Sequence, residues 1–183
     1  SCRVESFFLK ITNFSFFEGF LRHQFLRHRC RNGWFTSLIA TQFGIPISTP
    51  VFYLETLYHG LPWQSIFASE YICNSKNVEI FARNLSERNL TKELISLLTK
   101  ISDVTSSLWH HNLYHRDLSG KNILTVDGNK VYLVDLDSVK ILKNISLRYK
   151  IKNLTQIYDS FCDYVEDEIL KNCIYSLLPE YDL

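Results

Sequence analysis

The chain has 183 residues and a formal net charge of +1, and its composition is 46% hydrophobic and 14% aromatic. This length is enough for the core of one domain or of two small lobes, and the hydrophobic content excludes an intrinsically disordered chain. A net charge this close to zero identifies no partner, and it argues against nucleic acid as one. Five scattered cysteines without a Cys-x-x-Cys pair indicate reduced thiols in a cytoplasmic protein.

The first half of the chain predicts a strand, a helical region and two further strands. The apolar and aromatic segment 4–11 is typical of a strand. Residues 14–43 contain no proline, and their apolar side chains recur at intervals of three and four, as in one long helix or two in succession. Gly44 and the prolines that follow it end this region, and residues 51–57 and 65–72 are predicted to be strands joined by a turn at 59–62.

The second half predicts mostly helices around one β-hairpin. Residues 91–111 form a helix with one apolar face. Two short apolar segments, 122–126 and 130–134, flank Asp127-Gly128, which is typical of a hairpin turn. The chain is helical again from about Leu147. This order of elements predicts an α+β fold with a small sheet-bearing first lobe and a helical second lobe.

The residues suited to chemistry lie between the helix 91–111 and the hairpin. His115-Arg116-Asp117-Leu118 is followed by Asn122, at the interval that separates the aspartate and the asparagine in the catalytic loop of protein kinases. Phosphoryl transfer requires a carboxylate to position and deprotonate the acceptor hydroxyl. We therefore predict Asp117 as the base, with His115 and Arg116 as further catalytic residues of the same loop.

Two oxygen-bearing side chains are suited to a metal ion beside the transferred phosphate. Asn122 belongs to the loop, and Asp135 ends the second strand of the hairpin. Mg²⁺ prefers carboxylate and amide oxygens, so these two residues are the predicted metal ligands, and ATP and Mg²⁺ are the predicted cofactors. In the alternative, His115 is a core histidine and Asp117 a turn acid; this leaves Asp135 and Asp137 at the end of an apolar strand unexplained.

The segment that follows the hairpin distinguishes this sequence from those of protein kinases. It reads Val-Asp-Leu-Asp-Ser-Val from Val134 to Val139, where protein kinases continue as Asp-Phe-Gly. This Asp-Leu-Asp resembles the lipopolysaccharide kinase family, which includes the Kdo kinases and heptose kinases of the lipopolysaccharide inner core. Residues 29–55, with a central tryptophan and a Gly-Ile-x-x-x-x-Pro segment, and residues 148–154 are similar to further segments of that family.

The resemblance implies a protein-kinase-like two-lobed fold in one domain of residues 1–183. Residues 1–72 are expected to form a partial N-lobe with a truncated sheet, and residues 73–183 a reduced helical C-lobe. The implied activity is ATP-dependent phosphorylation of a sugar hydroxyl of Kdo or heptose in the lipopolysaccharide inner core, at the cytoplasmic face of the inner membrane. The implied partner is an inner-core sugar or a lipid A precursor. Two alternatives stay open: a kinase-fold enzyme acting on a protein or a small alcohol, and a non-catalytic kinase-like protein.

The same resemblance implies a nucleotide site in the first lobe. Lys10 is the strand lysine expected to pair with the α and β phosphates, the alternative being an edge-strand lysine that points to solvent. Glu70, Tyr71 and Ile72, in the linker between the lobes, are candidates for the adenine edge. Nine residues precede Lys10, fewer than a glycine-rich loop over the phosphates needs, so we interpret the sequence as a fragment.

The acid that usually orients such a lysine is not evident in the sequence. Glu18 is the only acidic residue between Lys10 and Glu55, so either Glu18 pairs with Lys10 or the ion pair is absent. Gly33 lies where some relatives carry an acid.

Residues 21–34 carry four arginines and two histidines without an acid. This segment is either a solvated helix face or a surface that binds acidic lipid or a phosphorylated saccharide. The second alternative implies peripheral contact with the inner membrane.

Overall fold

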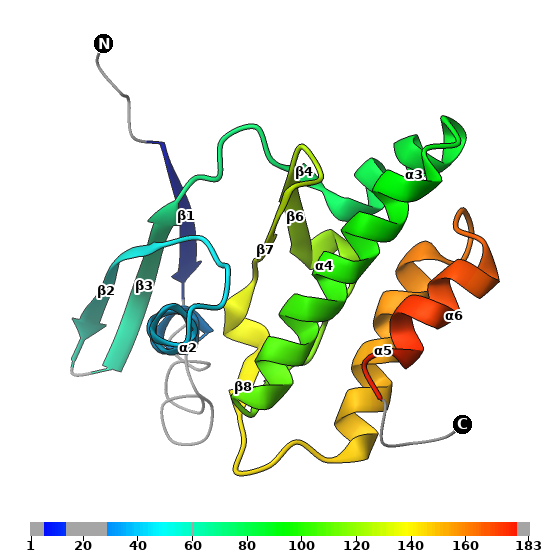
Figure 1. Ribbon diagram of the computed structural model, residues 1–183. Coiled ribbons are helices and arrows are strands. Elements are labelled where there is room, and N and C mark those ends of the chain that lie inside the picture. Colours follow the sequence, from blue (N-terminus) through cyan, green and yellow to red (C-terminus); the bar gives the residue numbers. More distant parts are fainter. Residues whose placement is uncertain (1–5, 14–28, 60, 179–183) are drawn as a thin grey trace. The chain divides into compact units, whose positions relative to one another are not determined.

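The structure is a computed structural model that describes residues 6–13, 29–59 and 61–178 (Figure 1). The chain divides into two compact units, residues 1–72 with 135–139 and residues 73–134 with 140–183. The first unit therefore contains the Asp-Leu-Asp segment, and the second contains the His-Arg-Asp loop.

The first unit is built on a three-stranded antiparallel sheet. Lys10 lies opposite Phe67 in the register of this sheet, and the next residue towards the N-terminus, Leu9, lies opposite Ala68. Since side chains alternate along a strand, Lys10 and Leu9 point to opposite faces of the sheet. The strands are β1 (Phe7–Asn13), β2 (Pro50–Tyr58) and β3 (Leu61–Glu70), in the order β1-β3-β2.

One face of the sheet is covered by helix α2 (Arg29–Gln42), which packs against all three strands and against the short helix η2 (Leu136–Ser138). The helix ends as the sequence predicts. Gly44 takes a left-handed φ of 69°, and the Ile45 N–H donates to the carbonyl oxygen of Ala40 at 2.9 Å. This is the hydrogen-bond pattern of a Schellman C-cap, for which glycine is the preferred residue.

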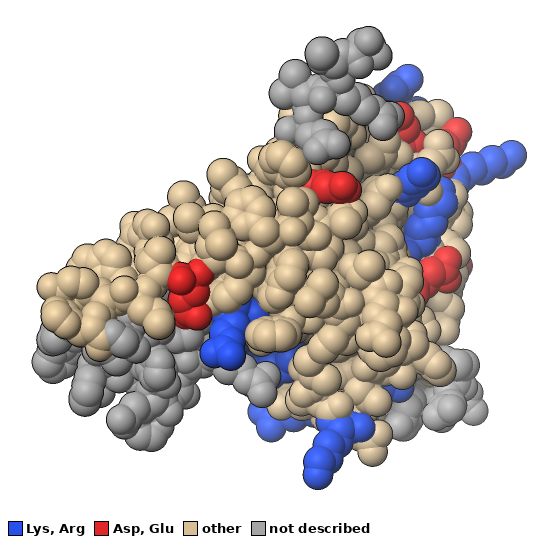
Figure 2. Space-filling model, turned by 90° about the vertical axis from the view of Figure 1, so that its left-hand side faces the viewer, with Lys and Arg blue, Asp and Glu red and all other residues tan. Residues whose placement is uncertain are grey.

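The opposite face of the sheet carries apolar side chains that stay exposed. Leu9 and Ile11 from β1 are 53% and 55% exposed, and Leu54 from β2 is 55% exposed. Their cross-strand partners Ala68 and Ile66 place all of them on the same face. Figure 2 shows one side of the molecule, where uncharged residues predominate and Lys, Arg, Asp and Glu are scattered.

The second unit packs helices around a small sheet. Its core centres on the apolar face of the long helix, where Leu97, Leu98, Ile101 and Leu108 are at most 2% exposed. The helices are α3 (Val78–Glu87), α4 (Thr91–His110), α5 (Leu147–Phe161) and α6 (Asp167–Tyr175); the strands β4 (Lys76–Asn77), β6 (Ile123–Val126) and β7 (Lys130–Leu133) form one sheet in the order β4-β6-β7, and β5 (Leu113–His115) pairs with β8 (Val139–Ile141).

Most predicted elements are present, with shifted ends. Helix α4 and the hairpin of β6 and β7 are confirmed, and Asp127 and Gly128 both take a left-handed φ, of 53° and 72°. The strands β2 and β3 are joined as predicted, but the connection is shorter than the predicted turn over residues 59–62, because β2 ends at Tyr58 and β3 already begins at Leu61. The predicted helical region 14–43 is tested only from Arg29 onward, since residues 14–28 lie outside the described residues.

Helix α3 was not predicted, although its sequence carries the signal. Val78, Ala82 and Leu85 are buried at intervals of four and three, as on one face of a helix. The helix begins at an N-cap, where the side chain of Asn77 accepts a hydrogen bond from the Glu79 N–H at 2.8 Å. No helix among the residues that the structure describes is long and apolar enough to span a membrane.

Candidate active site

The segment from His115, the last residue of β5, to the start of β6 carries the predicted catalytic residues, and the His115 side chain supports its backbone. The His115 side chain is fully buried, with Nε2 3.1 Å from the carbonyl oxygen of Val134. Its Nδ1 accepts a hydrogen bond from the Asp117 N–H at 3.3 Å. A carbonyl only accepts and an amide N–H only donates, so these partners select the neutral tautomer with the proton on Nε2. The buried His115 side chain therefore holds the backbone of Asp117 in position.

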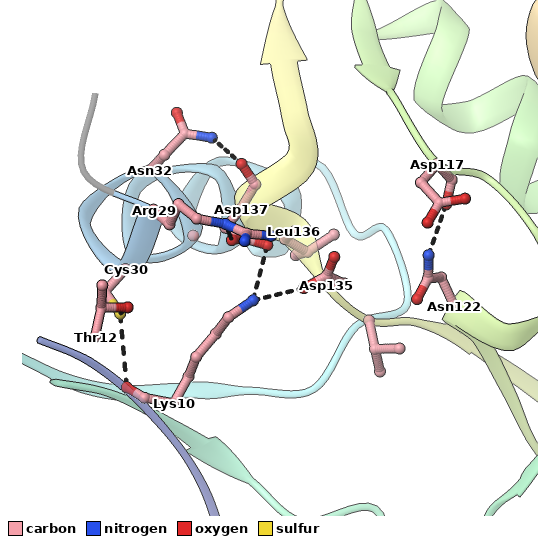
Figure 3. A network of polar contacts seen from close by, with 12 residues as sticks. Lys10, Thr12, Arg29, Cys30, Asn32, Asp117, Asn122, Asp135, Leu136 and Asp137 are labelled. Carbon is pink, nitrogen blue, oxygen red and sulfur yellow. Dashed lines mark hydrogen bonds and ion pairs between the residues drawn. The ribbon is translucent and has the colours of Figure 1, made fainter. Parts of the chain in front are cut away.

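The carboxylate of Asp117 stands at the surface of this loop and is 44% exposed. Its Oδ1 accepts a hydrogen bond from the Ser119 hydroxyl at 3.0 Å, and Lys121 Nζ lies 3.6 Å from Oδ2. Asn122 Nδ2 donates to the backbone carbonyl oxygen of Asp117 at 2.8 Å (Figure 3). This bond turns the amide oxygen of Asn122 away from the Asp117 carbonyl, and it ties the two ends of the loop together.

Helix α5 holds the backbone of the same loop through polar side chains that the sequence analysis did not single out. Asn153 Nδ2 donates to the carbonyl oxygen of His115 at 2.7 Å. Gln156 Nε2 donates to the carbonyl oxygen of Arg116 at 2.8 Å, and its Oε1 accepts from the Leu118 N–H at 3.1 Å. These contacts bind the backbone on both sides of Asp117, so the predicted base is held without using its own carboxylate.

A third α5 side chain completes this support. Ser160 Oγ accepts a hydrogen bond from the Gly120 N–H at 2.8 Å and donates to the carbonyl oxygen of Gln156 at 2.8 Å. Asn153, Gln156 and Ser160 are spaced by three and four, so they share one face of the helix. That polar spacing was the signal in the sequence, and it identifies α5 as the element that shapes the loop.

In the first unit, Lys10 meets two carboxylates that are two residues apart. Lys10 Nζ lies 2.6 Å from Asp135 Oδ1 and 3.0 Å from Asp137 Oδ1, and Arg29 Nε donates to Asp137 Oδ2 at 2.6 Å (Figure 3). The Asp137 side chain is 2% exposed and that of Asp135 is 31% exposed. Lys10 thus points into the unit, and the buried carboxylate lies between two cations.

Helix α2 fixes the backbone of the turn that carries these carboxylates. Asn32 Nδ2 donates to the carbonyl oxygens of Asp137 and Val139, at 2.8 Å and 3.0 Å. The hydroxyl of Thr36, which is 1% exposed, donates to the carbonyl oxygen of Leu136 at 2.7 Å. Since each of these bonds goes to the backbone, they hold the turn independently of the ion pairs.

The local charges set the protonation of the three groups. Burial raises the pKa of Asp137, and the nearby Asp135 carboxyl raises it further, against the effect of Lys10. Burial also acts to raise the pKa of Asp135, but its interactions with Asp137 and Lys10 outweigh burial and leave that pKa below its usual value. Burial acts to lower the pKa of Lys10, and its contacts with the Asp135 and Asp137 carboxylates overcome this effect, so the pKa of Lys10 is raised. Lys10 therefore stays protonated at neutral pH.

Residues 6–179 match the Lipopolysaccharide kinase (Kdo/WaaP) family. The chain belongs to this family. Its structure is similar to that of WaaP in complex with acyl carrier protein, with a TM-score of 0.73 and 18% identity, over 97% of this chain and 71% of the WaaP chain. A probable inactive serine/threonine-protein kinase of Dictyostelium discoideum is 33% identical over 89 residues, or 46% of this chain. The chain spans 7% of the length of that curated relative.

These comparisons confirm two predictions from the sequence. The resemblance that Asp135-Leu136-Asp137 and residues 29–55 indicated is confirmed by the family match. The α+β architecture is confirmed as a protein-kinase-like fold by the similarity to WaaP. Glu18, the helix acid considered as a partner for Lys10, lies outside the described residues. The partners that the structure shows for Lys10 are the two aspartates of the Asp-Leu-Asp turn, which the sequence analysis did not consider in this role.

The residues predicted for the adenine edge lie where β3 ends. The Glu70 N–H donates to the carbonyl oxygen of Thr49 at 2.9 Å, and the Glu70 carbonyl oxygen accepts from the Ser48 hydroxyl. The Tyr71 N–H donates to the carbonyl oxygen of Ser6 at 2.8 Å. A contact between adenine and the Glu70 N–H would therefore require the hydrogen bond to Thr49 to be exchanged, whereas the Glu70 carbonyl oxygen has a second lone pair.

Gly33, on helix α2, lies against the Asp-Leu-Asp turn. A Cβ at Gly33 would lie 3.4 Å from the Cβ of Asp137. We expect Gly33→Ala to change the free energy of unfolding by at most about 1 kcal/mol, since alanine is favoured in a helix. Gly33→Val should reduce it by about 1–3 kcal/mol, because its extra methyl groups overpack the turn. Urea unfolding measures both, and equal stability of the two variants would contradict this packing.

Proposed function

We propose that this chain is, or is part of, an ATP-dependent phosphotransferase that acts on a sugar hydroxyl of the lipopolysaccharide inner core. The observation that carries the proposal is the family match over residues 6–179. The held loop around Asp117 and the paired Lys10 support it, because a kinase site needs both a positioned carboxylate and a cation for the nucleotide phosphates.

The residues are assigned roles by their chemistry. Asp117 is the base, since its carboxylate is exposed on a fixed loop. Lys10 binds the nucleotide phosphates, and Asn122 and Asp135 are the Mg²⁺ ligands. Their donor groups fit that ion, because an amide oxygen and a carboxylate are the hard ligands that Mg²⁺ takes. Bound Mg²⁺ would neutralise charge on the phosphates. His115 is a positioning residue for Asp117.

A non-catalytic function is the second candidate. The observation that favours it is the Dictyostelium discoideum relative, which is named a probable inactive kinase. Against it stands the presence of Asp117, Asn122 and Asp135 in one chain, since a binding protein has no chemical use for all three. We also infer peripheral contact with the cytoplasmic face of the inner membrane, where the proposed acceptor is made. The excess of positive charge in the segment 21–34 supports such contact.

A substrate panel with labelled ATP tests this proposal. We expect Mg²⁺-dependent transfer of label to an inner-core acceptor that carries Kdo or heptose. Transfer to a protein or to a small alcohol instead would favour another kinase-fold activity. Absence of both transfer and nucleotide binding would favour the non-catalytic candidate. Labelled lipopolysaccharide would then be hydrolysed to its sugars, which identifies the phosphorylated residue by mass spectrometry.

A further inference from the structure

Asp135 and Asp137 both contact Lys10, but their surroundings differ. We infer that Asp137 is a positioning residue that anchors Lys10 for the nucleotide phosphates, while Asp135 is the exchangeable partner that is released to the metal ion. This inference rests on the proposed function. In protein kinases the strand lysine is oriented by a glutamate from the neighbouring helix. Here the Asp-Leu-Asp turn supplies both carboxylates.

Helix α2 cannot supply the orienting acid, because none of its residues from Arg29 to Gln42 is acidic. The helix instead carries a cation that contacts the turn. Arg29 Nε donates to Asp137 Oδ2 at 2.6 Å, so the helix acts on Lys10 through the carboxylate of the turn. Compared with the protein-kinase arrangement, the charge on the helix is inverted and the acid has moved to the turn.

Asp137 has the properties of a fixed anchor. Its side chain is 2% exposed, and each of its carboxylate oxygens faces a different cation, Oδ1 facing Lys10 at 3.0 Å and Oδ2 facing Arg29. Oδ1 accepts no hydrogen bond of good geometry from the residues described, so its contact with Lys10 is mainly ionic. The hydrogen bond from Asn32 to the Asp137 carbonyl holds the backbone as well. Moving Asp137 would leave a buried charge without compensation.

Asp135 has the properties of an exchangeable ligand. Its side chain is 31% exposed, and its Oδ1 is the atom that contacts Lys10. Asp135 has a left-handed φ of 59°, a backbone conformation that aspartate tolerates better than most residues. Lys10 Nζ also lies 3.0 Å from Asp137 Oδ1, so it keeps a fixed ionic partner when Asp135 is withdrawn.

Binding of fluorescent ADP to the full chain, with and without Mg²⁺, separates the two roles. Asp137→Asn should weaken metal-free binding by about 10-fold to 100-fold and leave the tightening by Mg²⁺ in place. Asp135→Asn should keep the metal-free affinity and lose the tightening by Mg²⁺. Arg29→Gln should weaken metal-free binding by up to about fivefold, since its side chain is 61% exposed. The matched control Arg31→Gln, on the exposed side of the same helix, should bind as the wild type does.

The possible outcomes decide the inference. Equal losses in the two aspartate variants, or losses exchanged between them, would overturn the division of roles. If thermal unfolding shows that Asp137→Asn is not folded, the pair of arginine variants decides: Arg29→Gln must bind metal-free ADP more weakly than Arg31→Gln, and equal affinities would overturn the anchor. A wild-type chain that binds no ADP under either condition would instead overturn the proposed function, and this inference with it.

Discussion

Replacement of Asp117 by alanine should reduce phosphate transfer by about 100-fold to 10,000-fold, because it removes the carboxylate that accepts the proton of the acceptor hydroxyl. The free energy of unfolding should change by less than about 1 kcal/mol. The carboxylate is 44% exposed, and its contact with Lys121 at 3.6 Å is an exposed ion pair, which contributes little to stability. Initial rates with labelled ATP, and urea unfolding of the same preparations, measure the two effects.

Asp103→Ala is the matched control for this prediction. Asp103 is exposed on α4 in the same unit, so the control removes an equal charge outside the candidate site. We expect it to transfer phosphate at the wild-type rate. Activity of Asp117→Ala within a few-fold of the wild type would rule out Asp117 as the base. An equal loss in both variants would point to net charge rather than to the loop.

The sequence was sufficient to predict the parts of the site that depend on spacing along the chain. The interval from Asp117 to Asn122 and the acid after an apolar strand are local patterns, and the structure keeps them on a loop and at the end of β7. The hairpin turn was predictable for the same reason, since Asp127-Gly128 favours left-handed backbone at both positions. Local chemistry determines such features before any long-range packing is formed.

The partners that hold the site could not be predicted in this way. The pairing of Lys10 with Asp137 joins residues 127 positions apart in the sequence, and the bond from Arg29 spans 108 positions. From the sequence, the acid that pairs with Lys10 is expected on the helix, because protein kinases place it there. Tertiary packing placed that acid on the turn, where two nearby cations offset the cost of burying it.

Helix α5 supports the loop through Asn153, and Asn153→Leu should reduce the free energy of unfolding by about 2–5 kcal/mol. Asn153 is fully buried; its Nδ2 donates to the His115 carbonyl oxygen, and its Oδ1 accepts from Trp109 Nε1 at 3.3 Å. Leucine has a similar size but no polar atoms, so both groups lose this buried partner, at about 1–3 kcal/mol each. Thr155→Ala, on the exposed side of α5, should stay within about 0.5 kcal/mol of the wild type.

The same variant separates a purely structural role from support of the catalytic loop. Well below its unfolding midpoint, Asn153→Leu should still transfer phosphate more slowly than Thr155→Ala, because the carbonyl that it releases belongs to His115, the residue that holds the Asp117 N–H. The loss should appear in kcat rather than in the KM for ATP, since the nucleotide phosphates are assigned to Lys10 in the other unit. A destabilised variant with wild-type kcat at low temperature would limit Asn153 to stabilising the fold. Reduced kcat with little loss of stability would instead show that the loop, more than the core, depends on this side chain.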